Sequence, residues 1–398
     1  MAYAEKLYHL QDLFSQLEDS RQRPQIELKQ VVGGAFLMMA TQMGSLNALE
    51  QEQGKPFWER WLGGDLASAD TIGRVYEGLE VEGLRLAVHR LYDRLKRNKA
   101  LKPRHGFCVL IIDGHESSSS YLRCCEGCLE RHIKIGGQER IQYYHREVIA
   151  MLSLERFPLL LDIEAQRKGE DEVAAALRLL ARVVDRYPRA FQVVLGDALY
   201  LRANVFQFLL AHGKEAIAVL KDEKRELWQD VQGLFPLEQP VIEVDHQRER
   251  RIWDIEDLES WGSLKSLVRV VRSLETKTCR RQRTKQKETQ TSDWMWATTS
   301  SVDKASGPTV VNLGHDRWLI ENRALNEMVT YWHANHLYRH HPNAIIAFWL
   351  TLFLALNLFR AFICLNIKPV LRARHTDLYF ARLLFVGLHE EPIRNRSP

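Results

Sequence analysis

Two aspartates follow short apolar runs that are typical of strands buried on both faces. Asp113 ends the run 107–113, FCVLIID, and Asp197 ends the run 190–197, AFQVVLGD. A carboxylate at the end of an apolar strand is costly to bury unless it is paired or binds a cation. Two such carboxylates on neighbouring strands would repel each other, and a divalent metal ion would relieve that repulsion. For either aspartate alone, capping of the next turn is the more common role.

A third carboxylate, Glu321, lies in the segment RWLIEN on a predicted helix. Taken alone, Arg317 and Glu321 have the i, i+4 spacing that more often makes a surface ion pair. Carboxylate oxygens suit Mg²⁺ or Mn²⁺ as ligands. Two such ions about 4 Å apart can activate a water molecule and stabilise the leaving oxygen of a phosphodiester. Asp113 and Asp197 are therefore candidate ligands of a two-metal site that cleaves phosphodiesters, whereas the pattern around Glu321 alone does not go beyond an ion pair.

A second group of candidate metal ligands follows the first aspartate. Cys125, Cys128 and His132 offer two thiolates and an imidazole at a spacing found in Zn²⁺ sites. The sequence has no second CxxC pair to complete a standard finger, so buried free cysteines are the more common alternative. His336 and His340 would share a helix face, where a solvated or phosphate-facing histidine is far more common than a metal ligand.

A strongly basic stretch, KTCRRQRTKQK, occupies residues 277–287. Its apolar content is too low for a core element, so we expect an exposed loop. Its cations repel one another unless a polyanion is present, which favours contact with phosphates over a merely solvated loop. The candidate DNA-binding side chains of this stretch are Arg280, Arg281, Arg283, Lys285 and Lys287.

The composition indicates a protein of several domains with sizeable cores. The chain has 398 residues, of which 45% are hydrophobic and 27% charged. The net charge is only +4, so a nucleic-acid footprint must lie in local clusters. Six cysteines are too few for a disulfide scaffold. The N-terminus shows no secretory pattern, and we expect a reduced, cytoplasmic protein.

The elements that must position the aspartates alternate in type. We expect strands at 107–113, 143–154, 157–163, 190–197 and 215–220, and helices at 170–187 and 201–212. The following region, 222–301, has the alternating pattern of antiparallel strands. A long helix is predicted over 316–339, ended by Pro342, and an apolar helix over 344–365. The apolar run of that helix is shorter than the ~20 residues of a membrane span, so we interpret it as a core helix.

The first hundred residues have helical periodicity. Ser68 is among several N-cap candidates before an amphipathic helix. In a helix-turn-helix module, Thr71 and Arg74 would lie on the first turns of a groove-reading helix. A plain helical bundle is an equal alternative.

Taken together, these blocks resemble the insertion-sequence DDE transposases. The resemblance rests on Asp113 at the end of a first strand, Asp197 at the end of a fourth strand with its following Ala-Leu-Tyr, and the block RWLIEN opening a late helix. The run WHANHLYRHHPNA, residues 332–344, is similar to the segment after the glutamate in those enzymes. The long strand-rich interval before Glu321 is similar to their inserted β-domain. The resemblance covers residues 105–366.

This resemblance implies a multidomain α/β fold, in which an RNase H-like mixed-sheet core is interrupted by a β-rich insertion and flanked by helical N- and C-terminal regions. The expected parts are a helical DNA-binding region (1–104), the first part of the core (105–221), the insertion (222–301), the catalytic helix with the end of the core (302–366), and a basic C-terminal tail (367–398).

The resemblance also implies a reaction and partners. Asp113, Asp197 and Glu321 would hold two Mg²⁺ or Mn²⁺ ions, and Arg317 would contact DNA near the scissile end. The ends of a mobile DNA element would be hydrolysed, and the freed 3′-hydroxyl would attack target DNA. Because two ends are cut in concert, a homodimer on DNA is expected, with no membrane involved. Related enzymes stack a tryptophan of the inserted domain on a flipped base, although core packing is the more common role for each of the candidates Trp253, Trp294 and Trp296.

One departure from the family pattern leaves two alternatives open. Many relatives carry a tyrosine three residues before the arginine and a lysine seven residues after the glutamate, where this chain has Gly314 and Met328. This favours, mildly, a catalytically silent DNA-binding protein descended from a transposase, although the intact carboxylates argue against it. An RNase H-like structure-specific nuclease, such as a junction resolvase, would need the carboxylates but neither the insertion nor the helical N-terminal region.

Overall fold

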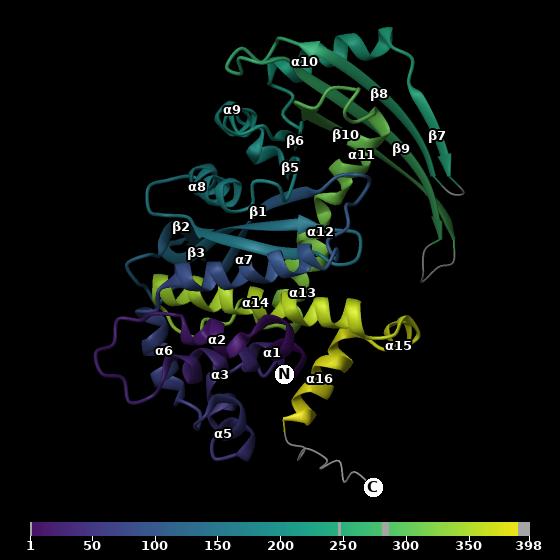
Figure 1. Ribbon diagram of the computed structural model, residues 1–398. Helices are drawn as coiled ribbons and strands as arrows, with labels where there is room; N and C mark the ends of the chain where they lie inside the picture. Colours follow the sequence, from purple (N-terminus) through teal and green to yellow (C-terminus); the bar gives the residue numbers. More distant parts are fainter. Residues whose placement is uncertain (1, 246–247, 281–285, 389–398) are drawn as a thin grey trace.

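The computed structural model describes residues 2–245, 248–280 and 286–388 (Figure 1). One mixed sheet of ten strands runs through it in the order β2-β3-β1-β5-β6-β10-β9-β8-β7, with β4 paired to β3. The strands of the core are β1 (Val109–Ser120), β2 (Leu129–Ile135), β3 (Gln138–Ser153), β4 (Leu159–Ala165), β5 (Val193–Gly196) and β6 (Glu215–Val219).

The pairing within the core confirms the predicted RNase H-like sheet. β4, β3 and β1 are antiparallel neighbours, and β5 and β6 then continue the sheet in parallel with β1. The predicted strands are all present with shifted ends, and β2 was not predicted. Asp113 does not end its strand as expected, because β1 continues to Ser120 through its pairing with β3.

Helices cover both faces of the core sheet (Figure 1). On one face lie the predicted helices α8 (Glu172–Arg186), which contacts β3 and β4, and α9 (Ala203–Ala211), which contacts β6. On the other face lie α7 (Val81–Arg97) and α14 (Pro342–Asn366), which both contact β4. Because the sheet is buried on both faces, the sequences of its strands are continuous runs of apolar residues.

The apolar helix α14 is a core helix, as predicted. Among the described residues it is the one helix long and apolar enough to cross a membrane, but 89% of its most apolar window is buried inside the protein. Three buried polar side chains of α14 have partners. Thr351 Oγ1 lies 3.1 Å from the Tyr76 hydroxyl, and Asn357 accepts from the Leu160 amide at 3.0 Å and donates to the Leu160 carbonyl at 2.7 Å. Arg360 donates to Glu327 at 2.9 Å.

The N-terminal region packs against α14 as a layer of helices. Besides α7, this layer comprises α1 (Ala2–Tyr8), α2 (Leu10–Ser15), α3 (Leu28–Ala40), α4 (Leu46–Glu50), α5 (Pro56–Leu62) and α6 (Ala69–Glu77). Ser68 caps α6 by accepting from the Thr71 amide, as predicted. Tyr76 of α6 stacks on Phe348 of α14 at a ring-centroid distance of 4.0 Å. Arg74 lies on the exposed face of α6.

The β-rich insertion continues the core sheet at its edge. Its strands are β7 (Val241–Asp245), β8 (Arg248–Leu258), β9 (Val268–Arg280) and β10 (Lys287–Thr298), and they are accompanied by α10 (Glu226–Leu234). Residues 296–298 of β10 pair with residues 217–219 of β6, so one hydrogen-bonded ladder joins the insertion to the core.

The described part of the basic stretch is largely strand. Its first residues extend β9 to Arg280, and Lys287 begins β10 opposite Arg280. The expectation of a loop was therefore wrong for residues 277–280 and for Lys287. Arg281, Arg283 and Lys285 lie outside the described residues.

The chain returns from the insertion through a broken helix. Its parts are α11 (Gly307–Asp316), α12 (Trp318–Ile320), the π-helical turn η3 (Glu321–Leu325) and α13 (Asn326–Tyr331). The predicted helix over 316–339 was thus wrong at its end, because residues 332–341 are irregular. Pro342 begins α14 instead of ending a helix, and proline suits that first position, where its missing N–H is not needed. Two helices, α15 (Pro369–Arg374) and α16 (Asp377–Gly387), occupy the region expected as a tail.

Candidate active site

The two aspartates are brought together by the register of β1 and β5. Ile111 pairs with Leu195 in this parallel pair, and Asp113 and Asp197 each follow two residues later. Because side chains alternate along a strand, residues two apart share a face. Asp197 caps the 3-10 turn η1 (Ala198–Tyr200) by accepting from the Leu199 amide at 2.8 Å. Asp197 therefore caps the next turn and also lies beside Asp113 on the same face of the sheet.

The Asp113 carboxyl is largely buried among other acidic groups. Its side chain is 13% exposed. Burial raises the pKa of Asp113 to about 7, the Arg317 guanidinium opposes this shift, and the charges of Asp197, Glu321 and Glu172 add to it. The three carboxylates predicted from the sequence thus share one electrostatic environment.

Arg317 joins the helical segment to the strands. Its Nη1 lies 2.8 Å from Glu321 Oε1 and 3.7 Å from Asp113 Oδ2. Its guanidinium also lies over the Trp318 ring, 4.7 Å from the centroid. Arg317 is only 7% exposed, whereas the Glu321 side chain is 35% exposed, so the predicted ion pair forms at the rim of a buried region.

Glu321 opens the π-helical turn, in which each hydrogen bond spans one more residue than in an α-helix. Single π turns of this kind are frequent at functional sites. Downstream of the turn, Met328 is fully buried in the core. A lysine at this position would place a charge in an apolar environment, so the surroundings of this position suit the methionine.

Gly314 is the other position that departs from the expected pattern, and it packs directly against a neighbouring side chain. A Cβ atom at this position would lie 2.3 Å from Cε2 of Trp296, whose ring fills the place of a side chain. Trp296 is 2% exposed, and it therefore has the core-packing role. Trp294 stacks beside Trp296 at 6.2 Å and meets Trp318 edge-on at 6.2 Å, which places it next to the Arg317 side of the site. Trp253 lies under the guanidinium of Arg272.

A fourth carboxylate, Glu172, was missed by the sequence analysis. It accepts hydrogen bonds from the Tyr200 hydroxyl at 2.7 Å and from Arg146. A Cβ atom at Gly114 would lie 2.2 Å from the Glu172 carboxyl carbon, so the glycine after Asp113 makes room for it. Glu172 itself looks like an ordinary acidic residue on the first turn of a helix. Two residues in the sequence could have pointed to Glu172. Gly114 directly follows the predicted ligand Asp113, and Tyr200 lies three residues after the predicted ligand Asp197.

The three carboxylates make a donor set that fits hard divalent ions. All the available ligand atoms are carboxylate oxygens, as Mg²⁺ and Mn²⁺ prefer. The largely buried Asp113 carboxyl and the acids that raise its pKa would be stabilised by such a charge. Their oxygen atoms are not all within 4.8 Å of one another among the described residues, and Arg317 lies between two of them.

The predicted cysteine cluster has different partners from those expected. Cys125 and Cys128 meet His145 and His340, and the four ligand atoms all lie within 4.8 Å of one another. His132 lies elsewhere, exposed on β2 with its Nδ1 3.1 Å from Glu139, so its assignment was wrong. The reason is that β2 is extended, and four residues of strand carry His132 roughly 13 Å from Cys128.

The histidines of the cluster come from distant parts of the chain. His340 was discounted on the assumption of a helix, but it lies in the irregular segment 332–341. Burial and the neighbouring His340 lower the pKa of His145 to about 4, so this ring is neutral.

The irregular segment also contacts the strand that carries Asp113. His115 Nε2 lies 2.7 Å from Asn335 Oδ1, which links β1 to the residues that follow the broken helix.

Comparison with known families places these residues in one matched region. A family model described as a transposase DDE domain matches residues 104–358, which is more than half of the chain. The matched region includes the three carboxylates, Arg317 and the β-rich insertion. No curated protein matches the chain.

Proposed function

Since the chain belongs to the transposase DDE-domain family, we propose that it cleaves the ends of a mobile DNA element and joins them to target DNA. The observation that carries this proposal is that Asp113 and Asp197 share one face of the sheet and that Arg317 lies between Asp113 and Glu321. The register of β1 and β5 sets the positions of Asp113 and Asp197, and the broken helix sets the position of Glu321. DNA is the partner, and a homodimer on DNA would cut two ends in concert. The free cysteines suit a reducing, cytoplasmic location.

In this proposal Asp113, Asp197 and Glu321 hold two Mg²⁺ or Mn²⁺ ions. When bound, such ions activate the attacking oxygen and stabilise the leaving oxygen of an in-line displacement at phosphorus. The protein forms no covalent bond to the DNA. The protein's own residues orient the carboxylates. Glu172 accepts hydrogen bonds from Tyr200 and Arg146 and packs against Gly114, the residue after Asp113.

Arg317 has two roles in this proposal. In the protein alone its guanidinium neutralises Asp113 and Glu321. If the same carboxylates held a cation, Arg317 would be released from that pair and would be placed to contact a DNA phosphate near the scissile end. Arginine is suited to this exchange because its planar fork matches both carboxylate and phosphate.

The insertion favours a transposase over a junction-resolving nuclease. Four strands of the insertion extend the core sheet from β6, and such a nuclease does not need them. The intact carboxylates favour an active enzyme over a silent DNA-binding protein.

The decisive experiment is cleavage of the DNA that flanks the gene. With Mg²⁺ or Mn²⁺, the purified protein should cut a fragment carrying both flanks at short inverted repeats and leave 3′-hydroxyl ends. A chelator should abolish this cutting. Mapping the ends by sequencing, with a plasmid present as target, reads out both cleavage and joining. Cutting at branched DNA regardless of sequence would favour the nuclease, and binding without cutting in either metal would favour the silent protein.

The basic hairpin provides a second prediction, on binding alone. Replacing Arg280, Arg281, Arg283, Lys285 and Lys287 with glutamine should weaken DNA binding at moderate salt. The plot of log affinity against log salt should flatten by ~0.9 for each phosphate that the variant no longer neutralises, which amounts to a few units. The weakening should be similar on any sequence, because phosphate contacts position the protein without specifying bases.

The melting temperature is the control for this variant, since a stretch with so few apolar residues contributes little to a core. If the variant melts normally and keeps the parent's salt slope, the hairpin does not touch DNA. The electrostatic footprint then belongs to the N-terminal helices around residues 90–104.

A further inference from the structure

Four ligand side chains from three distant parts of the chain meet next to the sheet. Cys125 and Cys128 lie in the turn between β1 and β2, His145 lies on β3, and His340 lies just before α14. We propose that these four residues bind one Zn²⁺ ion, which fastens the β1–β2 turn and β3 to the segment 332–341 that follows the broken helix. This site is separate from the carboxylates and does not depend on the proposed reaction.

The distances fit a tetrahedral site. The two Sγ atoms are 3.7 Å apart, His145 Nε2 lies 3.3 Å from each of them, and His340 Nε2 lies 3.2 Å from Cys128 Sγ. With Zn–S bonds of ~2.3 Å and Zn–N bonds of ~2.0–2.1 Å, a tetrahedral ion separates two sulfurs by roughly 3.8 Å and a sulfur from a nitrogen by roughly 3.5 Å. The cysteines are free, and 3.7 Å is far beyond the length of a disulfide bond of about 2.05 Å.

The donor types select the metal. Two thiolates and two imidazoles in a tetrahedron are typical of zinc, whereas the carboxylates of the candidate active site suit Mg²⁺ or Mn²⁺. Two thiolate charges would balance the charge of the ion. Because protein atoms fill all four positions, the site is closed, as in structural rather than catalytic zinc sites.

The turn that carries the cysteines has a conformation that presents both sulfurs to one side. The Cys125 amide donates to Cys128 Sγ at 3.2 Å, and the Cys128 amide donates to the Cys125 carbonyl at 3.1 Å. A Cβ atom at Gly127 would lie 2.7 Å from Pro342 Cγ, so the glycine lets this turn pack directly against the start of α14. The turn is thus held beside His340 independently of any metal.

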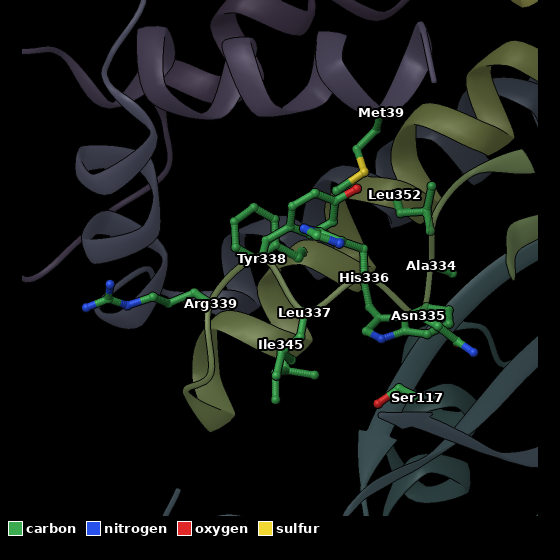
Figure 2. A pocket seen from close by; sticks show the side chains of 12 residues that line it. Met39, Ser117, Ala334, Asn335, His336, Leu337, Tyr338, Arg339, Ile345 and Leu352 are labelled. Carbon is green, nitrogen blue, oxygen red and sulfur yellow. The ribbon is translucent and has the colours of Figure 1, made fainter. Parts of the chain in front are cut away.

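A zinc ion at this cluster would affect the irregular segment 332–341, which contains His340. Figure 2 shows a pocket lined by residues 334–339 together with Met39 of α3, Ser117 of β1 and side chains of α14. Within this segment the backbone forms turns, such as that closed by the His336 amide donating to the His333 carbonyl at 2.9 Å, and Asn335 reaches His115 on the strand of Asp113. A zinc ion at His340 would fix the far end of the segment, so that the connection between Glu321 and α14 keeps one conformation.

The test is the metal content of the full chain purified without chelator. We expect about one zinc per chain by elemental analysis, and a lower melting temperature after chelation that Zn²⁺ restores and Mg²⁺ does not. The Co²⁺-substituted protein should show the intense visible bands of a tetrahedral ion and a thiolate-to-cobalt charge-transfer band. Neither measurement involves DNA, so both can succeed or fail independently of transposition.

Matched variants separate this site from chance binding. Cys125→Ser, Cys128→Ser and His340→Asn should each reduce the zinc content from about one to near zero. His132→Asn and Cys279→Ser change the same residue types outside the cluster and should keep it. Loss of zinc in His132→Asn with retention in His340→Asn would overturn the assignment, as would the absence of zinc from the parent protein.

If the ligand variants fail to fold, the parent protein still decides the matter. A mercurial reagent that modifies thiols should release the zinc in step with the modification of two cysteines, as followed with a coloured chelator. Zinc that stays bound after all thiols have reacted would contradict a cysteine-ligated site.

Discussion

Replacing Asp113, Asp197 or Glu321 with alanine is expected to abolish Mg²⁺-dependent strand cleavage while DNA binding stays intact or becomes slightly stronger. Each change removes a metal ligand together with a negative charge near the DNA phosphate. Metal ions contribute several kcal/mol of transition-state stabilisation, so a loss of ~4 kcal/mol would slow cleavage about a thousandfold. The measurement is single-turnover cleavage of labelled element ends, with binding followed separately by gel shift.

Asp303→Ala is the matched control, since this carboxylate is exposed in the loop before α11. It should cut at the parent rate. The fold should survive the Asp113 change, because the buried Asp113 carboxyl sits among repelling acidic neighbours. Parent-rate cutting by any one of the three variants would remove that residue from the metal site.

The second large effect is on stability. Gly314→Ala is expected to lower the free energy of unfolding by about 3 kcal/mol, because the added methyl group meets the buried ring of Trp296. The ring lies within 2.3–2.8 Å of the new atom at three of its own atoms, and the surrounding core holds it in place. The tyrosine that many relatives carry at this position should prevent folding altogether. Chemical denaturation monitored by tryptophan fluorescence measures both changes.

Gly233→Ala is the control for this substitution. Gly233 lies in α10 with no heavy atom within 4 Å of an added Cβ, so the change should stabilise the helix by roughly 0.5–1 kcal/mol. Alanine would help the α11 helix in the same way, and the difference between the two variants therefore isolates the collision with Trp296. Equal unfolding midpoints for Gly314→Ala and the parent would show that the ring can move aside.

The sequence predicted the parts of the site that depend on local pattern. The apolar runs before Asp113 and Asp197 identify buried strands, and their equal parity places both carboxyls on one face once the strands pair in parallel. The broken helix was harder, because the apolar spacing around Glu321 does not distinguish a π turn from an α-helix. Glu172 could not be identified, since its role depends on a contact with Gly114 across the fold.

The cysteine–histidine cluster likewise has one part that local sequence pattern indicates and one part that depends on contacts across the fold. The CxxC spacing is local, and the two cysteines that it indicates lie close together in the structure. Their partner His340 lies 212 residues from Cys128, and no periodicity connects residues so far apart. His132 was preferred because it is near in sequence, but an extended strand carries a nearby residue away from the turn.

The position of α14 in the chain has a consequence for the order in which the protein is made. The surfaces on which this helix packs, namely α3, α6, α7 and β4, are all synthesised before it. Until α14 has been made, these surfaces lack the helix that packs against them in the folded protein. The core therefore closes only after the helical layer, the sheet and the insertion have all been synthesised. Chains that have not yet made α14 expose these apolar surfaces and are prone to aggregation and proteolysis.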